Sequence, residues 1–540
     1  MRLNSMSYNN VWSKIVCVLV ILALYNCANR GTPTGGLKDE IPPEIEKTTP
    51  ENYSVNFNED EIRIYFNEYV KLKNIQKQLV ISPPMDYEPE ITPLGTASKM
   101  VKIKIKDTLK PNTTYAFNFG QSITDNNESN PFSYYRYVFS TGSTIDSLKV
   151  SGAVLDAEKR TPEQFVSVML YPFNETYTDS TVYKEKPMYV TNTLDSLKVF
   201  EIQNVKAGTY KLIAIKDQNN NFTYQNKTDK IGFYEKTISV PTDSLYTIKL
   251  FKEVVDSKVM RPKQVAGEKI EFGYEGELQN MKIRMLADLP ENFEYRIVKN
   301  SETDSLYYWY KPKLELDSTY FVVSHKSFVD TLKHRFRTID RDTLRMKSLQ
   351  TGTVAFDEDF LVTGTTPLQD FDDSKISIMD KDSTLVPFKS NFDTLQNTYA
   401  LKFDKSEGNS YKLQFFPDAI TDFYGKSHDT LNYSIRTKLE ADYGNVRVQL
   451  QNAVYPVIIQ LITEKGEAKY ETYAEKQQYY DFRNVEAGNY NLRVLFDSNK
   501  NGVWDTGWFL KQQQPERVSY YPDLLDVRAG WDLIQEFILE

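Results

Sequence analysis

Two stretches of the chain align without gaps: FEIQNVKAGTYKLIAIKDQNNNFTYQN (200–226) and YDFRNVEAGNYNLRVLFDSNKNGVWDT (480–506). Each one reads as a strand, a turn, a second strand and a loop. The turns NVKAG and NVEAG contain a glycine, which is free to take positive φ. The runs YKLIAI and YNLRVLF have strand length and are rich in residues that favour strands. The chain therefore carries two copies of one β-rich unit.

The pattern V-x-x-G-x-Y in both copies, a turn before a core strand, resembles the transthyretin-like, carboxypeptidase-regulatory type of β-sandwich. This resemblance implies two such domains, which we place at residues 148–251 and 443–540.

A second, weaker repeat pairs FGQSITDNNESNPFSYYRYVFST (119–141) with FPDAITDFYGKSHDTLNYSIRT (416–437). Both copies contain I-T-D, then a turn, then an alternating strand. Upstream of the first copy, VKIKIK alternates strictly between apolar and charged residues, which is typical of a strand with one face in water. The motifs around it are IPPEIEKTTPEN (41–52), IRIYFNEYV (62–70) and LKPNTTYAFNF (109–119).

This set of motifs resembles the bacterial Ig-like domain, of the SbsA type, found at the start of many Bacteroidota envelope lipoproteins. The resemblance implies an Ig-like domain at residues 41–143 and a more divergent one at 341–438. Residues 253–340 end in a similar pattern of strand, turn and strand, so we expect a degenerate Ig-like sandwich there.

The composition agrees with an all-β protein, a string of about five small β-sandwich domains. A length of 540 residues suggests three to five domains, and the 40% hydrophobic fraction is enough for real cores. The 37 tyrosines and 30 phenylalanines favour strands over helices. The net charge of −9 argues against nucleic acid as a partner.

The N-terminus has the features of an export signal. Arg2 and Lys14 supply positive charge beside the apolar run 15–25, which is too short for a membrane span. Of the two cysteines, Cys17 lies inside this run and Cys27 follows it. A cysteine at the cleavage site resembles a bacterial lipoprotein, so we expect a signal peptide at 1–26 and diacylglycerol on Cys27.

Residues 27–40 are rich in Gly, Thr and Pro, and we interpret them as a flexible tether behind the lipid. We therefore expect a lipid-anchored protein of the outer membrane. The first acidic residues after Cys27 are Asp39 and Glu40, so a surface-export signal of early acidic residues is weak. Both the periplasmic and the cell-surface face stay open.

Motifs for catalysis are absent from the sequence. The three histidines, His325, His334 and His428, do not stand in zinc-hydrolase spacing, and no G-x-S-x-G or P-loop pattern occurs. Cys27, the one cysteine of the predicted mature chain, is the lipid site. We therefore expect no enzyme and no cofactor other than the covalent lipid.

The loop after the second repeat has partial calcium-loop spacing, with the candidate ligands Asp497, Asn499, Asn501 and Asp505. A full EF-hand loop needs a bidentate Glu at its twelfth position, where this chain has Trp508. The first repeat does not keep the ligand set. We therefore expect a structural loop, with weak calcium binding as the alternative.

Aromatic residues gather near the C-terminus: Trp504, Trp508, Tyr520, Tyr521 and Trp531. We expect them to fill the core of the last domain, with a docking face for protein or sugar as the alternative.

The pattern Asp, then Ser or Thr, then Leu or Thr recurs through the chain and suits turns that lead into strands. It also resembles the O-glycosylation sequon of exported Bacteroidota proteins. Candidate acceptors are Thr108, Ser147, Ser196, Ser244, Ser305, Thr343 and Thr394.

The sequence therefore predicts a non-catalytic, lipid-anchored envelope scaffold or adaptor, an accessory subunit of an outer-membrane protein complex. The alternative is a surface adhesin or glycan-binding lipoprotein. The expected partners are membrane lipid, through the anchor, and an outer-membrane protein complex, with a glycan under the alternative.

Overall fold

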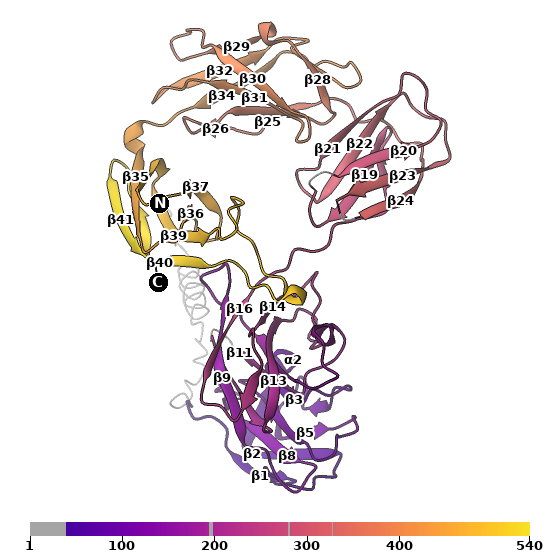
Figure 1. The fold of residues 1–540 in the computed structure, drawn as a ribbon, viewed down its shortest axis with the longest axis vertical. Helices are drawn as coiled ribbons and strands as arrows, with labels where there is room; N and C mark the ends of the chain where they lie inside the picture. The colour runs from indigo at the N-terminus through magenta and orange to yellow at the C-terminus, as the bar shows by residue number, and fades with distance from the viewer. Residues whose placement is uncertain (1–38, 194–197, 279–280, 327, 540) are drawn as a thin grey trace, which may run out of the picture. The chain divides into compact units, whose positions relative to one another are not determined.

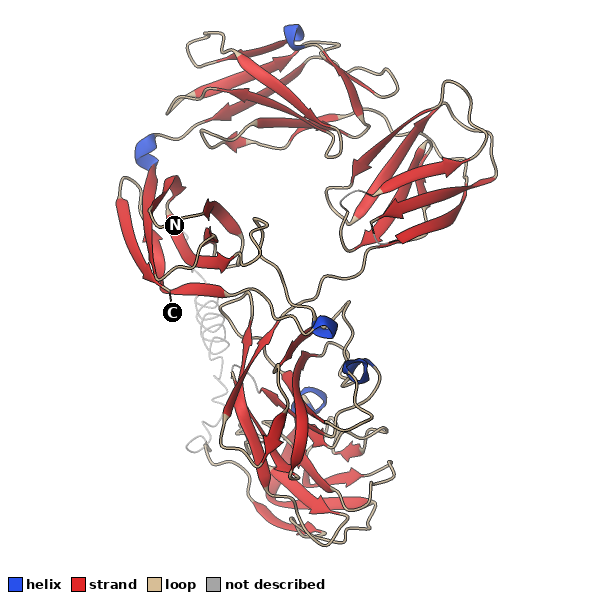
Figure 2. Ribbon diagram, viewed as in Figure 1, coloured by secondary structure: helices blue, strands red, loops and turns tan. Residues whose placement is uncertain are grey.

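The computed structural model describes residues 39–193, 198–278, 281–326 and 328–539. Nearly all of its regular structure is strand (Figure 2), which confirms the predicted all-β string of small sandwiches. The described part of the chain divides into two compact units, residues 39–81 with 85–145 and residues 82–84 with 146–539. Among the described residues, no helix has the length and apolar character needed to cross a membrane.

The first sandwich contains the sheets β1-β2-β5-β4, with β7 beside β2, and β3-β6-β8. VKIKIK lies at the end of β5 and beyond it; Val101 and Ile103 are fully buried while the lysines point outward, as predicted. The elements of this sandwich are β1 (Ile45–Thr49), β2 (Glu61–Leu72), α2 (Ile75–Gln78), β3 (Val80–Ser82), β4 (Glu90–Thr92), β5 (Ser98–Lys104), β6 (Thr114–Asn118), β7 (Ile123–Asp125) and β8 (Arg136–Ser140).

The I-T-D repeat has a clear structural role. Asp125 ends β7, and its carboxylate accepts four backbone N–H bonds of 2.7–2.9 Å from the loop at residues 127–130. Asp422 ends the corresponding strand β33 and accepts the N–H groups of Tyr424 and Lys426. The motif recurs because an aspartate holds the turn that follows each strand.

The second sandwich has β9 at the centre of a three-stranded sheet, antiparallel to β12 and parallel to β16. Its other sheet has the order β11-β10-β13-β14, with β15 beside β13. The elements are β9 (Leu148–Asp156), β10 (Val166–Pro172), η1 (Asp179–Tyr183), β11 (Tyr189–Thr193), β12 (Val199–Val205), β13 (Gly208–Lys216), β14 (Lys230–Phe233), β15 (Ile238–Val240) and β16 (Leu245–Leu250).

The fifth sandwich repeats this strand order. β35 lies between antiparallel β38 and parallel β41, and the other sheet is β37-β36-β39-β40. The aligned texts therefore form β12–β13 in one copy and β38–β39 in the other. The elements are η3 (Glu440–Asp442), β35 (Tyr443–Gln451), β36 (Val457–Ile462), β37 (Ala468–Ala474), β38 (Tyr479–Glu486), β39 (Gly488–Phe496), η4 (Phe509–Lys511), β40 (Val518–Val527) and β41 (Asp532–Ile538).

The turn between the repeated strands differs from the prediction in one respect. The left-handed residue is Asn204 (φ 60°) or Asn484 (φ 53°), not the glycine. Asparagine tolerates this conformation, and in the second sandwich it coincides with an irregular register of β12. The final tyrosine of the motif ties the turn: the hydroxyl of Tyr210 donates to Lys206 O at 3.0 Å, and the fifth sandwich repeats this bond.

The third and fourth sandwiches pack two main sheets each. The third contains β17 (Lys258–Val259), β18 (Lys263–Ala266), β19 (Lys269–Glu275), β20 (Lys282–Leu286), β21 (Glu294–Lys299), β22 (Ser305–Lys311), β23 (Ser318–His325) and β24 (Phe328–Arg335). The fourth contains β25 (Met346–Ser348), β26 (Gly352–Thr353), β27 (Phe360–Gly364), β28 (Leu368–Phe371), η2 (Asp373–Lys375), β29 (Ile376–Met379), β30 (Phe388–Asp393), β31 (Thr398–Phe403), β32 (Ser410–Phe415), β33 (Ile420–Asp422) and β34 (Leu431–Arg436).

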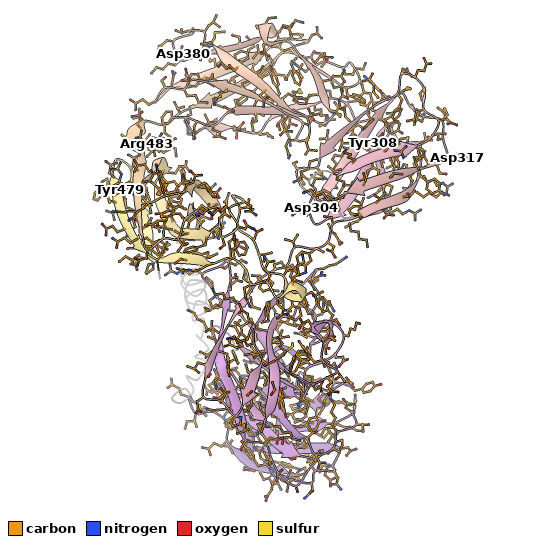
Figure 3. All side chains as sticks on the ribbon, in the orientation of Figure 1. Asp304, Tyr308, Asp317, Asp380, Tyr479 and Arg483 are labelled. Carbon is orange, nitrogen blue, oxygen red and sulfur yellow. The ribbon has the colours of Figure 1, made fainter. Side chains whose placement is uncertain are left out.

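Each sandwich has its own hydrophobic core, drawn from one continuous stretch of the chain. In the third, Tyr308 is buried, whereas Asp304 and Asp317 each directly precede a strand (Figure 3). Contacts between sandwiches involve both loop and strand residues, such as Phe509 and Arg493 of the fifth sandwich.

Candidate functional site

The loop between β39 and β40 of the fifth sandwich reaches the second sandwich, which lies in the same compact unit. We call residues 506–514 of this loop the latch. Its own fold is held by Trp508 and Gln513, which exchange two backbone hydrogen bonds of 2.8 and 3.0 Å. Its helical turn η4 contacts η1 and β14 of the second sandwich (Figure 1).

Phe509 is the apolar centre of the latch and is only 1% exposed. Its ring lies 5.5 Å from Phe233, 6.3 Å from Tyr183 and 6.5 Å from Tyr224, measured between ring centroids. All three neighbours belong to the second sandwich. Full burial of a phenylalanine side chain contributes about 1.5–3 kcal/mol, so this contact is a substantial anchor.

Glu253 is the polar centre of the same contact and is 7% exposed. One carboxylate oxygen accepts the backbone N–H of Phe509 at 2.6 Å, and the other accepts the hydroxyl of Tyr224 at 2.8 Å. A buried carboxylate needs such donors, because desolvation without them is costly. The latch therefore supplies a hydrogen bond to a buried carboxylate that lies just after β16, the last strand of the second sandwich.

Three more hydrogen bonds join the latch to the second sandwich. The hydroxyl of Thr506 donates to Lys252 O at 2.7 Å, and Gln514 Nε2 donates to Phe233 O at 3.0 Å. Gln512 Nε2 donates to Asp179 Oδ2 at 3.1 Å. A Cβ at Gly507 would lie 2.7 Å from the Phe251 ring, so a larger residue would not fit there.

A second contact between these two sandwiches surrounds Arg493 of β39. Its guanidinium is nearly buried, donates to Gln460 Oε1 at 2.6 Å and pairs with Glu158 at 3.5 Å. The hydroxyl of Tyr520 donates to the Glu158 carbonyl at 2.6 Å. Arg160 adds hydrogen bonds to Asn491 and to the carbonyl of Pro522. The latch is therefore one of two contacts between the repeated units.

The C-terminal aromatic residues divide: Tyr521 packs against the core of the fifth sandwich, as predicted, whereas two tryptophans do not. Trp508 is 42% exposed and Trp531 is 63% exposed, so that prediction is wrong for both. Trp504 is half-buried and donates its indole N–H to Glu516 O. The residue that docks is Phe509, which sequence reasoning missed because a lone phenylalanine in a polar loop carries no periodic signal.

The four candidate calcium ligands do lie together in the loop after β39. Asp497 accepts the N–H groups of Asn501 and Gly502 and the hydroxyl of Tyr473. The carboxamide groups of Asn499 and Asn501 both donate to Asp505. Apart from the bond from Tyr473, which lies in β37, these bonds stay within the loop and form a turn. Among the described residues, no cluster of three or more His, Cys, Asp or Glu is placed to hold a metal ion.

Asp217 occupies the same place in the first repeat and accepts the N–H groups of Asn219 and Phe222. Burial raises the pKa of Asp217. At Asp497 burial also raises the pKa, but the hydrogen bonds from Gly502, Tyr473 and Asn501 outweigh it and leave the pKa below its usual value. Both aspartates hold the turn that follows the repeated strand.

The proposed glycosylation sites divide by exposure. Exposed hydroxyls outside strands belong to Thr108, Ser147, Ser244, Thr343 and Thr394. Ser305 is buried in β22 and donates to Glu271, so the folded chain does not present it to a transferase. Ser196 lies outside the described residues, as do the predicted signal peptide and Cys27.

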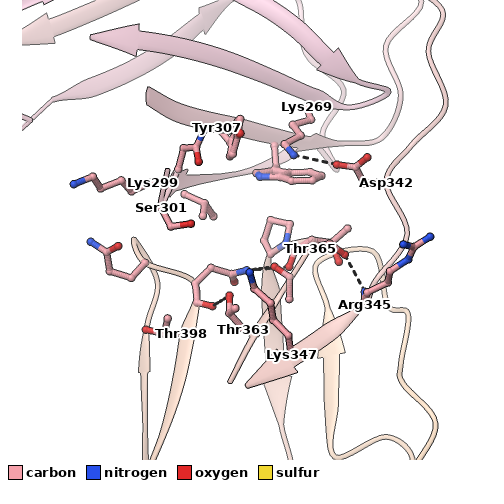
Figure 4. Close-up of a pocket in the computed structure, with 18 of the residues that line it drawn as sticks. Lys269, Lys299, Ser301, Tyr307, Asp342, Arg345, Lys347, Thr363, Thr365 and Thr398 are labelled. Atoms are coloured by element: carbon pink, nitrogen blue, oxygen red, sulfur yellow. Dashed lines mark hydrogen bonds and ion pairs between the residues drawn. The ribbon is translucent and has the colours of Figure 1, made fainter. Parts of the chain in front are cut away.

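A pocket of about 550 Å³ lies where the third and fourth sandwiches meet (Figure 4). Four cationic side chains and one carboxylate line it: Lys269, Lys299, Arg345, Lys347 and Asp342. The one carboxylate, on Asp342, pairs with Lys269 at 3.0 Å.

Aromatic, hydroxyl, amide and apolar residues form the rest of the lining, and the apolar ones are Val298, Leu349, Gly364 and Pro367. Lys269 Nζ lies 4.1 Å from the centroid of the Tyr307 ring and 4.7 Å from that of Trp309. The polar residues of the wall are Asn300, Ser301, Thr343, Thr363, Thr365, Thr366, Gln396, Asn397 and Thr398.

The walls of the pocket are joined by direct contacts between the two sandwiches. The N–H of Lys299 donates to Leu395 O at 2.7 Å, and Lys311 Nζ donates to Phe423 O at 2.7 Å. Arg341 Cζ lies over the ring of Tyr424, 4.1 Å from its centroid. Arg341 in turn pairs with Glu268 at 2.6 Å.

Comparison with known proteins gives a family for one of the domains. Residues 39–141 match the family model of the bacterial Ig-like domain. This match confirms the Ig-like prediction for the first sandwich and leaves the other four without a family. A search of the curated proteins finds no match.

Similar solved structures include the S-layer protein rSbsC(31-844), with 12% identity, coverage of 90% of this chain and 67% of that chain, and a TM-score of 0.16. The TIE protein of Bacillus anthracis is 12% identical over 94% of this chain and 76% of that chain, with a TM-score of 0.13. The BSP domain of a biofilm-associated protein is 9% identical over 76% and 99%, with a TM-score of 0.14. TM-scores this low carry no argument about function.

Proposed function

We propose that this chain is a non-catalytic scaffold or adaptor, anchored by lipid on Cys27 to the outer membrane, where it serves as an accessory subunit of a protein complex. The observation that carries the proposal is the latch. The hydroxyl of Thr506 donates to the carbonyl of Lys252, so the two ends of the segment from residue 252 to residue 506 are held together. A tied stretch has far fewer conformations than a free string, which suits a part that holds others at set positions.

The chemistry of the described residues supports a role without catalysis. The pocket has one carboxylate, on Asp342, which is already paired with Lys269, so its lining lacks a free acid–base pair. His334 is buried, and burial lowers its pKa, which favours the neutral form. His428 accepts the N–H of Ile420 and His325 packs against Phe328. The three histidines therefore have structural surroundings.

The alternative is a surface glycan-binding lipoprotein. The pocket favours it, because cations, an aromatic ring and many hydroxyl groups are the side chains that bind sugars. The two functions are compatible in one chain, since the latch and the pocket use different residues.

Purification of the tagged full-length lipoprotein in mild detergent tests the scaffold proposal. Recovery of an outer-membrane complex in fixed stoichiometry is the expected result. The Cys27→Ala variant is expected in the soluble fraction, without that complex. Recovery of the wild-type lipoprotein alone, or a Cys27→Ala variant that stays in the membrane, would count against the proposal. Protease treatment of intact cells then tells which face of the membrane carries the chain.

A further inference from the structure

We propose that the pocket between the third and fourth sandwiches binds an acidic saccharide, whose carboxylate or sulfate groups pair with Lys299, Arg345 and Lys347. This inference concerns a ligand of the chain itself and does not depend on the lipid anchor or on the scaffold role.

The charge of the pocket is the first argument. The chain as a whole has a net charge of −9, yet four cationic side chains meet one carboxylate here. The pairing of Lys269 with Asp342 leaves three cations, and within the described part of the chain none of these three forms an ion pair. Cationic side chains without ion-pair partners around one pocket favour an anionic ligand, and the positions of Lys299 and Arg345 at opposite sides of it suit an extended one (Figure 4).

The polar lining is the second argument, because it selects a sugar over a simple anion. Asn300 donates to the hydroxyl of Tyr307 at 2.7 Å and thereby fixes the edge of this ring in the wall. Thr365 accepts the N–H of Arg345 at 2.9 Å and donates to Thr343 O at 2.6 Å. Hydroxyl and amide groups held this way can hydrogen-bond sugar hydroxyls, and the volume lies in the range of about 300–1,000 Å³ seen for small-ligand sites.

The rigidity of the walls is the third argument. Asn397 donates to the carbonyls of Gly364 and Thr366 and accepts the N–H of Leu368, so three hydrogen bonds tie its loop to residues 364–368. On the facing wall, the backbone bond from Lys299 to Leu395 joins the two sandwiches directly. A ligand that enters preformed walls does not have to order them, which favours its binding.

The single carboxylate argues for binding rather than hydrolysis. Glycoside hydrolysis uses two carboxyl groups on opposite sides of the scissile bond. Asp342 is the one acidic side chain of this lining and is engaged by Lys269. The saccharide is therefore held intact.

Isothermal titration of the full chain tests the proposal, with tri-galacturonic acid and a heparin tetrasaccharide as acidic probes. Galactotriose serves as the neutral probe and sodium sulfate as the simple anion. The pocket variant is Lys299→Gln/Lys347→Gln. The matched control is Lys282→Gln/Lys412→Gln, which removes two exposed lysines from strands of the same sandwiches outside the pocket. A second pocket variant, Ser301→Trp, fills the rim without changing charge.

We expect at least one acidic oligosaccharide to bind the wild type, and its affinity should fall at high salt. The affinity of the Lys299→Gln/Lys347→Gln variant for it should be lower by about tenfold or more. The control variant should bind like the wild type, Ser301→Trp should lose binding, and galactotriose should not bind. Failure of both acidic probes at millimolar concentration would overturn the proposal, as would equal binding by the wild type and both pocket variants. Sulfate that binds as tightly as the oligosaccharides would overturn the assignment to a saccharide.

Discussion

The backbone N–H of Phe509 donates a hydrogen bond of 2.6 Å to Oε1 of Glu253, a residue 256 positions earlier in the chain. This bond joins the second copy of the repeated unit to the end of the first. The Phe509 side chain is buried at the same place, among aromatic rings of the second sandwich. Phe509 thus supplies an apolar contact through its ring and a polar contact through its backbone, so loss of the ring should weaken the latch while the contact around Arg493 remains.

Replacement of Phe509 by alanine should open the latch. A large-to-small change at a buried aromatic site costs about 3–5 kcal/mol. Hydrogen exchange should become faster in η1 and β14 of the second sandwich, while the other sandwiches keep their protection. The matched control is Leu510→Ala, since Leu510 is 52% exposed and should change nothing. Unchanged exchange in Phe509→Ala would show that the latch is not closed in solution.

Replacement of Glu253 by glutamine should weaken the latch from the other side. The carboxylate accepts bonds through both oxygens, whereas glutamine has one acceptor oxygen and turns a carboxamide N–H group toward the hydroxyl of Tyr224, so the bond that this hydroxyl donates is lost. We expect a loss of about 1–3 kcal/mol in the free energy of latch opening, measured by hydrogen exchange. The exposed Glu235→Gln serves as the control. Equal exchange in the two variants would contradict the role given to Glu253.

Replacement of Asp125 by asparagine should make the first sandwich less stable at neutral pH and less sensitive to acid. Burial raises the pKa of Asp125, but the N–H bonds from Ser129, Asn130, Glu128 and Asn127 outweigh it, so the folded pKa is lowered. A lowered folded pKa stabilises the fold above the unfolded pKa, about 3.9, and this contribution is lost as pH falls through the folded pKa.

Thermal unfolding at pH 7 and at pH 2 measures this effect. The difference in unfolding temperature between the wild type and Asp125→Asn should be large at pH 7. It should shrink at pH 2, where the wild-type carboxylate is protonated. Asp60→Asn, at an exposed position, is the control. A difference of the same size at both pH values would mean that the charge of Asp125 is not what stabilises the turn.

Calcium should leave the unfolding temperature unchanged if the loop at residues 497–505 is structural. Its carboxylates already accept bonds from backbone and carboxamide groups of the same loop. A bound ion stabilises the native state in proportion to its occupancy, so titration with calcium and then with a chelator is a direct test. A rise in unfolding temperature that Asp497→Asn abolishes would instead establish the metal site.

The sequence predicted the elements whose signal is local. The alternation of VKIKIK predicts a strand, and the turn residues and β-rich runs of the two aligned stretches predict theirs. Turn chemistry accounts for Asp125 and Asp422, which accept hydrogen bonds from the loops that follow them. The contacts between sandwiches were not predictable in this way. Phe509 and Glu253 are isolated residues in irregular segments. Their contact depends on the path that brings the fifth sandwich back to the second, and no periodic sequence pattern predicts that path.

The pocket was missed for a similar reason. Lys299, Arg345 and Lys347 come from two sandwiches and have no motif spacing, so each one alone reads as a solvent-exposed lysine or arginine. Trp508 and Trp531 were predicted to be buried, because large aromatic side chains usually are, but both are exposed. Sequence pattern thus identified strands and turns, while the joints between domains required the structure.

Thiol cross-linking in intact cells tests the latch most directly. The variant Asp179→Cys/Gln512→Cys places two cysteines where the wild-type side chains meet at 3.1 Å, and the only natural cysteines are Cys17 and Cys27. A short bismaleimide should cross-link this variant efficiently, should fail with either single variant, and should fail when Phe509→Ala is added. Absence of a cross-link, although both thiols react with a monofunctional maleimide, would contradict a latched scaffold.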